Sequence, residues 1–349
     1  MKTSVPLMAY AKQNNNFDLL RFLLAVTVFL VHSYVLSGSL FLEPISKILS
    51  SEVAVQSFFI VSGFLIFMSY ENSKTAKSYF QKRFWRIFPA YFFVIIVTVL
   101  IASLFTAYTL DHHWWVSVLK YFLANLFFLN FINPNLPGVF EANLNPTING
   151  ALWTLKIEVM FYLAVPLFVS LFNKVGRLPG MLCLFVCSVI YSYVLLAIDD
   201  HGGGESFLAL RRQLPGQLTY FIVGAAGYYY FEYFKRFSKP IFLLAIMVIL
   251  FRAYLPWVVF EPIALGVLVL YFATIFPYIG NFGKYGDFSY GIYILHFPVL
   301  QIFISHQLFD QSPLLALITS SSIVLLFAVL LWNFVEKPFL RHSSHYVSG

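Results

Sequence analysis

The sequence predicts an all-α integral membrane protein with about ten transmembrane helices. Of its 349 residues, 60% are apolar and 11% are charged, whereas a soluble domain has roughly 25% charged residues. Apolar stretches long enough to cross a bilayer recur along the chain. No hydrophilic domain interrupts them, and the only long polar connections are residues 71–85 and 108–149, so we expect a single membrane domain over residues 1–349.

The predicted spans are apolar runs separated by short polar connections. The first run is too long for a removable signal peptide and lacks its small-residue cleavage site, so we expect it to remain as an anchor. Leu255 and Pro256 alone separate the seventh and eighth spans, which therefore form a tight helical hairpin. The ten spans are 17–37, 53–70, 86–107, 150–172, 180–198, 216–233, 240–254, 256–275, 287–308 and 314–334.

Residues 114–132 form an eleventh apolar stretch with two leading Trp residues and an interior Lys120. These features favour an interfacial or re-entrant helix over an additional span. A full span here would also invert the orientation of every later segment.

The distribution of positive charge predicts the orientation. With a cytoplasmic N-terminus, fifteen of the 22 Lys and Arg residues fall in inner segments and four fall in outer segments. Such a bias is typical of membrane proteins, and it places both termini in the cytoplasm. The net charge of +7 is explained by this topology, so it gives no reason to expect nucleic-acid binding.

The first span carries charge, which is costly inside a membrane and usually functional. Arg21 and His32 are eleven residues apart, which is three helical turns plus about 20°, so both project from one face. Asp18 lies on the same stripe. The rise between Arg21 and His32 is about 16 Å, which places Arg21 near the cytoplasm and His32 in the outer half. This arrangement would suit a path or site that crosses the membrane.

Two further clusters carry charge. Arg83 and Arg86 share a helix face at the cytoplasmic start of the third span, which would suit a phosphorylated cytosolic ligand; positive-inside anchoring is the simpler interpretation. Glu158 lies at the predicted depth of His32 and could orient that imidazole. A structural ion pair between Glu158 and Lys156 or Arg252 is an equal alternative.

In the ninth predicted span, Tyr290, Tyr293 and His296 fall at three-residue spacing on one face. His296 is either functional or a hydrogen-bonding anchor between helices.

Two motifs and two cysteines do not indicate a site. "DHHWW" (111–115) lacks further ligands at metal-binding spacing, and "HGGGES" (201–206) has no accompanying G-x-S-x-G elbow. We expect an aromatic belt and a flexible outer loop, respectively. We expect Cys183 and Cys187 to be packing thiols on one helix face. The sequence therefore predicts no metal site.

Six elements in order along the chain resemble the membrane acyltransferase-3 family, the bacterial O-acyltransferases of surface glycans. Arg21-x10-His32 is similar to the family's R-x10-H signature. The other elements are "FFIVSGFLI" (58–66), "KRFWRIFPAY" (82–91), "LWTLKIEVMFY" (152–162), "FSYGIYILHFPV" (288–299) and "EKPF" (336–339). The first element departs from many members because "FDLLRFL" lacks their glycines. Some members carry a fused C-terminal hydrolase-like domain, which we do not expect here.

The resemblance implies that a cytosolic acyl-CoA, usually acetyl-CoA, supplies an acetyl group to a sugar hydroxyl outside the cytoplasm. Such an acceptor is lipopolysaccharide O-antigen, an exopolysaccharide or a lipid-linked sugar, modified at the bacterial inner membrane. His32 would be the general base or the transient acyl carrier, and Glu158 would support it. Arg21, Arg83 and Arg86 would bind the donor, with no metal involved. The residues expected to line the site are Asp18, Ser62, Trp153, Tyr290, Tyr293 and His296.

A polytopic transporter or flippase of a lipid-linked or acylated glycan is the alternative, because buried His, Glu and Arg also line transport paths. The absence of a detectable inverted repeat argues against it. Besides acetyl-CoA and the glycan, the expected partners are membrane lipids. The oligomeric state, the acyl chain and the acceptor hydroxyl stay open at this point.

Overall fold

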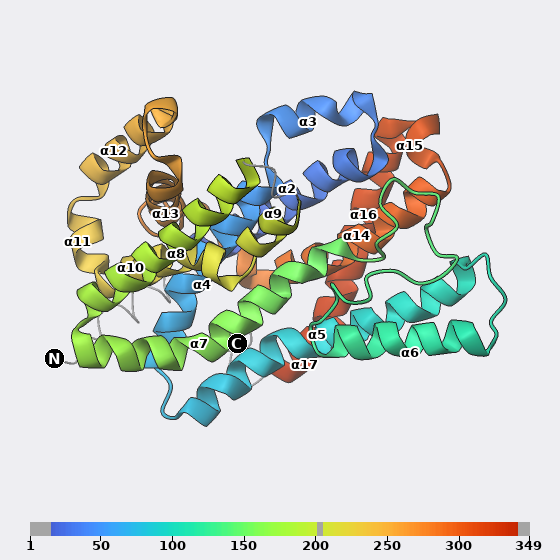
Figure 1. The fold of residues 1–349 in the computed structure, drawn as a ribbon, viewed down its shortest axis with the longest axis horizontal. Helices are drawn as coiled ribbons and strands as arrows, with labels where there is room; N and C mark the ends of the chain where they lie inside the picture. The colour runs from blue at the N-terminus through green and yellow to red at the C-terminus, as the bar shows by residue number, and fades with distance from the viewer. Residues whose placement is uncertain (1–14, 201–204, 341–349) are drawn as a thin grey trace. The chain divides into compact units, whose positions relative to one another are not determined.

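A computed structural model describes residues 15–200 and 205–340 of the chain. Within these residues the regular structure is helical, and every one of the ten predicted spans has a corresponding helix (Figure 1). These helices are α2 (Phe17–Ser37), α4 (Ser51–Glu71), α5 (Ala76–Phe105), α7 (Trp153–Val175), α8 (Arg177–Asp200), α10 (Leu214–Tyr229), α12 (Ser238–Leu250), α13 (Trp257–Thr274), α14 (Ser289–Ser305) and α16 (Pro313–Leu331).

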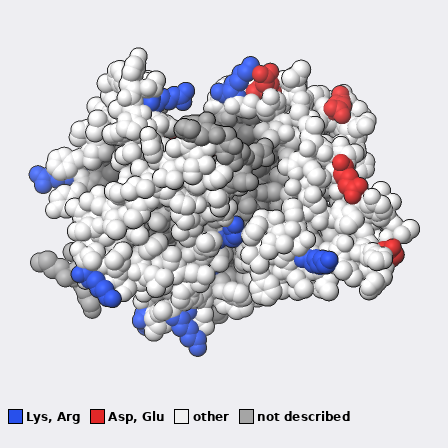
Figure 2. Space-filling view, in the orientation of Figure 1, with Lys and Arg blue, Asp and Glu red and all other residues white. Residues whose placement is uncertain are grey.

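Seven stretches of the described chain are helical, long and apolar enough to cross a membrane, and α12 and α14 are shorter apolar helices. The face of the molecule in Figure 2 consists mostly of uncharged atoms, with sparse charged side chains. The all-α integral membrane fold is therefore confirmed. The count of ten spans stays a prediction, as does the cytoplasmic position of the termini, which lie outside the described residues together with most of "HGGGES".

Helix α6 (His112–Leu126) occupies most of the eleventh apolar stretch. Its 15 residues extend about 22 Å, which is shorter than a hydrocarbon core of about 30 Å. The buried residues Trp114, Val118, Tyr121 and Asn125 share one helix face, and Asp111 caps the first turn by accepting a hydrogen bond from the backbone N–H of Trp114. Length and one-sided burial favour an interfacial or re-entrant helix.

Shorter helices connect the longer ones. They are η1 (Leu40–Leu42), α3 (Glu43–Ile48), η2 (Gly150–Leu152), α9 (Glu205–Arg211), α11 (Phe231–Arg236), η3 (Arg252–Tyr254), η4 (Phe282–Tyr285), α15 (Leu308–Gln311), the π-helical η5 (Trp332–Glu336) and α17 (Lys337–Leu340).

The chain forms two compact units. The first comprises residues 1–20, 55–80 and 157–281, and the second comprises residues 21–54, 81–156 and 282–349. Each unit is therefore assembled from segments that are distant in sequence, and α2, α4, α5 and α7 contribute residues to both.

The first unit is built around close contact between α4 and α10. A Cβ atom on Gly63 would lie 2.0 Å from the Phe221 carbonyl oxygen, and one on Gly224 would lie 2.1 Å from that of Ile60. Glycine is thus required on both helices, as in other membrane helix pairs that pack backbone to backbone. The stacked rings of Phe161 and Phe221, with centroids 4.0 Å apart, extend this core to α7.

The second unit packs α14 against α16, again through a glycine. A Cβ atom on Gly291 would lie 2.9 Å from Cα of Ala328. Near the start of α14, Gly286 has a φ of +129°, and a Cβ atom there would meet the Trp332 indole at 2.1 Å. Gly286 thus permits both the turn before α14 and the position of the π-helical segment η5.

A long connection, residues 127–149, runs from α6 to the start of α7 in the same unit. Its apolar side chains Leu136, Val139, Phe140 and Ile148 are buried in a cluster with residues of α5 and α6. Gln301 of α14 anchors it, because Nε2 donates to the carbonyls of Asn145 and Thr147 at 2.5 and 2.6 Å, and Oε1 accepts from Nδ2 of Asn143 at 2.8 Å. The segment is therefore fixed to the helix that carries His296.

Candidate active site

A pair of histidines joins α2 to α14. Nδ1 of His32 lies 2.8 Å from Nε2 of His296, and Nδ1 of His296 lies 3.2 Å from the Ile292 carbonyl oxygen. His296 is fully buried, whereas His32 is partly exposed. The edge of the His32 ring also meets Phe297, with centroids 5.8 Å apart. The structure thus brings together two residues that the sequence placed in separate clusters.

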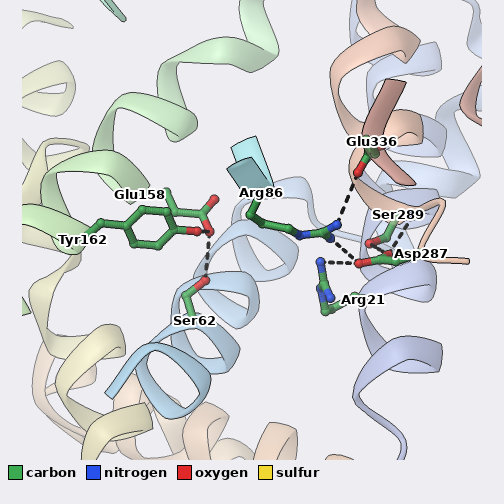
Figure 3. Close-up of polar contacts among 8 residues, drawn as sticks. All are labelled: Arg21, Ser62, Arg86, Glu158, Tyr162, Asp287, Ser289 and Glu336. Atoms are coloured by element: carbon green, nitrogen blue, oxygen red, sulfur yellow. Dashed lines mark hydrogen bonds and ion pairs between the residues drawn. The ribbon is translucent and has the colours of Figure 1, made fainter. Parts of the chain in front are cut away.

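Four charged groups of the same unit form a second cluster near the start of α14 (Figure 3). Arg21 Nη2 lies 2.5 Å from Asp287 Oδ2, and Nη2 of Arg86 donates to that same oxygen. Nη1 of Arg86 also pairs with Glu336 Oε2 at 3.2 Å. Both carboxylates have side chains that are only 2% exposed. The four formal charges cancel, which is how such groups are accommodated in an apolar environment.

Asp287 is the centre of this ionic cluster. While Oδ2 accepts from both arginines, Oδ1 accepts from the backbone N–H of Ser289 at 3.1 Å and from its hydroxyl. The carboxylate therefore links α2 and α5 to the first turn of α14, where a negative charge is also favoured by the helix dipole. Glu336 adds η5 to the same cluster; π-helical turns of this kind are frequent at functional sites.

The sequence did not identify Asp287 or Glu336 as site residues. Asp287 was available as an acid directly before an apolar run, which is the signal that could have found it. Glu336 opens the "EKPF" element named above, but nothing in the sequence assigned it a role at the site. The π-helical segment η5 carries it, and its Oε2 pairs with Arg86.

Several predicted lining residues have structural partners in the second unit. The Tyr290 hydroxyl donates to the Ile87 carbonyl at 3.0 Å, and the Arg86 guanidinium lies 5.9 Å from the Tyr290 ring centroid. The Tyr293 hydroxyl lies 2.7 Å from Thr154 Oγ1. Trp153 begins α7 and is partly buried, and Arg83 lies one turn before Arg86 on α5.

The remaining predicted residues belong to the first unit. Glu158 accepts hydrogen bonds from the Tyr162 hydroxyl at 2.6 Å and from the Ser62 hydroxyl at 3.4 Å (Figure 3). Asp18 lies in the first turn of α2. Because Glu158 and His32 belong to different units, the expected support of His32 by Glu158 stays a prediction. No cluster of three or more His, Cys, Asp or Glu side chains suited to a metal occurs among the described residues.

The family model described as an acyltransferase domain, the acyltransferase-3 domain, matches residues 14–333. The chain belongs to the acyltransferase-3 family. An O-acetyl transferase of Shigella phage Sf6 is 27% identical over 352 positions, covering 95% of this chain and 98% of the relative. Peptidoglycan O-acetyltransferase OatA of Listeria monocytogenes is 24% identical, covering 83% of this chain and 51% of the relative. Nodulation protein 10 of Rhizobium leguminosarum is 33% identical, with about half of each chain covered.

No solved structure matches this acyltransferase-3 chain. The family model and the named relatives show that the chain is an O-acetyltransferase with a multi-pass membrane fold. The match includes both members of the histidine pair, His32 and His296, as well as Arg21, Arg86 and Asp287 of the ionic cluster. Its end at residue 333 leaves out Glu336.

Proposed function

We propose that this O-acetyltransferase moves an acetyl group from cytosolic acetyl-CoA to a sugar hydroxyl of an extracytoplasmic glycan. The acceptor class is lipopolysaccharide O-antigen, an exopolysaccharide or a lipid-linked sugar, and the membrane is the bacterial inner membrane. The observation that carries the proposal is His32, a partly exposed imidazole on a membrane helix, held by a buried histidine about three turns from the ionic cluster. A relative that acts on peptidoglycan, by its name, supports a glycan acceptor.

His32 can serve the transfer in two ways. As a general base, it accepts the proton of the sugar hydroxyl while the hydroxyl oxygen attacks the thioester carbonyl and the C–S bond breaks. As a nucleophile, it takes the acetyl group first and passes it to the hydroxyl in a second step. In both cases the sugar proton finally replaces the acetyl group on the CoA sulfur, directly or through solvent.

The donor end of the proposed site is the arginine-rich start of α5. We assign Arg83 and Arg86 to the CoA phosphates, with Arg21 lining the same end, because guanidinium groups match phosphate geometry. Asp287 and Glu336 neutralise part of this positive charge. The ionic cluster therefore holds Arg21 and Arg86 in place at the donor end, and we assign donor binding to these two residues and Arg83 together.

The test uses membrane vesicles from host cells that express the wild-type chain or His32→Ala in place of the native copy. Vesicles receive acetyl-CoA labelled in the acetyl group, and the glycans are analysed by mass spectrometry. We expect labelled acetyl ester on the glycan and release of free CoA with the wild-type chain, and neither with His32→Ala. Transport of glycan without consumption of thioester would instead indicate a flippase.

A further inference from the structure

We infer that His296 is a positioning residue that fixes the tautomer of His32 and leaves Nε2 of His32 as the reactive nitrogen. This inference rests on the proposed function, in which His32 acts on the acyl group or on the acceptor hydroxyl. It adds the identity of the nitrogen that acts and the residue that selects it. Both are given by the hydrogen bonds of the histidine pair.

The direction of these hydrogen bonds follows from the Ile292 carbonyl, because that group can act only as an acceptor. A carbonyl oxygen only accepts, so Nδ1 of His296 must carry the proton in its contact with Ile292. In a neutral imidazole the other nitrogen is then an acceptor, which makes Nε2 of His296 the acceptor in the histidine pair. Nδ1 of His32 must therefore donate. Nε2 of His32 is left with its lone pair and without a proton.

The geometry of the histidine pair suits such a directional hydrogen bond. The ring planes differ by only 25°, and the ring centroids are 5.1 Å apart. This separation exceeds the 2.8 Å between the two nitrogens by about two ring radii, so both nitrogens lie close to the line that joins the centroids. The N–H of His32 consequently points along the lone pair of His296, which is the strongest arrangement for a hydrogen bond.

The reverse arrangement would require a charged His296. If His296 were an imidazolium, both of its nitrogens would donate and His32 would present an N–H from Nε2. His296 is fully buried, and the groups around its ring include His32, the Ile292 carbonyl, the Tyr293 backbone and the rings of Tyr293 and Phe297. None of these groups is an acid that could balance the charge. Burying that charge in a membrane protein is costly, which favours the neutral pair.

His296 itself has little freedom to rotate. Its ring lies 5.9 Å, centroid to centroid, from that of Tyr293, which is fixed through its hydroxyl to Thr154. The Phe297 ring, whose centroid lies 6.3 Å from that of His296, occupies space that Gly150 leaves open, because a Cβ atom there would lie 2.7 Å from the ring. These contacts hold the acceptor nitrogen of His296 in one place. His32 is therefore oriented by a rigid neighbour, as the acid orients the histidine of a Ser-His-Asp triad.

The two proposed roles of His32 both use this arrangement. As a base, Nε2 takes the sugar proton and the resulting imidazolium is stabilised through Nδ1–H by the lone pair of His296. As a nucleophile, Nε2 attacks the thioester carbonyl and CoA leaves as the thiolate, giving an acetyl-imidazolium with the same Nδ1–H contact. His296 stays neutral in both cases and forms no bond to substrate.

The experiment compares two substitutions of His296 that differ in one property. His296→Gln keeps a hydrogen-bond acceptor close to the position of Nε2, whereas His296→Leu removes it at similar size. His306→Leu is the matched control, because His306 is an exposed histidine at the end of the same helix. Host-cell vesicles containing each variant at equal protein level receive labelled acetyl-CoA over a range of concentrations, which yields kcat and KM for the donor.

We expect His296→Leu to lower kcat by about 10²-fold or more, in the range of a lost or misoriented general base, with the donor KM within about twofold. His296→Gln should retain kcat within about tenfold of the wild type. The control His306→Leu should have the kcat of the wild type. An active His296→Leu beside an inactive His32→Ala would overturn this inference alone. Equal loss in the Leu and Gln variants would also overturn it, because then the acceptor is not what matters. An active His32→Ala would overturn the proposed function itself.

Nitrogen NMR supplies a readout that does not depend on turnover. In protein labelled with 15N-histidine, with the His32→Ala spectrum used for assignment, His32 should show a protonated Nδ1 and a proton-free Nε2. In His296→Leu we expect this preference to be lost. A proton on Nε2 of His32 in the wild-type protein would contradict the inference directly.

Discussion

Arg86→Ala tests whether the ionic cluster stabilises the fold. Arg86 is bonded to two buried carboxylates, and its loss affects them differently. Asp287 keeps Arg21 and the two hydrogen bonds from Ser289. Glu336 loses the arginine it is paired with, and its Oε1 already has no hydrogen-bond partner within the described chain. The substitution therefore leaves Glu336 as a buried carboxyl group without its arginine, which must either stay charged and desolvated or take up a proton.

The magnitude follows from that difference. Removing one partner of a buried ion pair costs about 3–5 kcal/mol, because the remaining charge stays desolvated. We expect Arg86→Ala to lower the free energy of unfolding by this amount. Adding Glu336→Gln removes the acidic group at nearly constant size, so the double variant should recover about 1–3 kcal/mol, within the range of coupling between contacting residues.

The assay is reversible unfolding of purified protein in mixed detergent micelles, followed by circular dichroism, for both single variants and the double variant. Arg252→Ala is the matched control, because Arg252 is exposed in η3; it should change stability by no more than about 0.5 kcal/mol. The reasoning would be refuted if Arg86→Ala were as stable as the control. It would also be refuted if the effects of Arg86→Ala and Glu336→Gln simply added.

Three further predictions concern topology, donor binding and turnover. Reporter fusions should place residue 78 in the cytoplasm and residue 204 outside. Arg83→Ala should weaken acetyl-CoA binding about tenfold or more, since each charge-assisted phosphate contact contributes roughly 1.5–3 kcal/mol; equilibrium binding to purified protein measures this. His32→Ala should lower turnover about 10²–10⁴-fold while acetyl-CoA still binds, and Glu158→Gln should have the same effect more mildly, both measured as acetyl ester formed in vesicles.

Each of these has a contrary outcome. A cytoplasmic signal at residue 204 would break the ten-span topology and the depth match between His32 and Glu158. If the affinity for acetyl-CoA is unchanged in Arg83→Ala, Arg83 does not bind the donor, and membrane anchoring is the interpretation that is left for it. If Glu158→Gln turns over at the wild-type rate, Glu158 does not support His32, and its role is structural, through its hydrogen bonds with Ser62 and Tyr162.

Much of the fold could be predicted because its signals are local. A run of apolar residues determines where a membrane helix lies, and all ten predicted spans have a helix in the structure. The 15-residue α6 contains the two Trp residues and Lys120, the features from which a shorter helix was predicted instead of a full span. The prediction that Arg21 and His32 project from one helix face required only the period of the helix.

The partners of those residues could not be predicted from one sequence. The structure pairs Arg21 with Asp287, which lies far from it in the sequence. The histidine pair similarly joins positions 264 residues apart. Such contacts depend on which helix faces meet. Helical periodicity shows which residues share a face of one helix, but it does not show which other helix packs against that face.

The way Gln301 holds the connection from α6 to α7 has a consequence for how such transferases diversify. Its amide nitrogen binds the backbone carbonyls of Asn145 and Thr147, which any residue at those positions would supply. Side chains there can change over evolution without loosening the anchor, whereas Asn143, which donates through its side chain, cannot be replaced as freely. The side chains at positions 145 and 147 can therefore vary while the helix that carries His296 stays as it is.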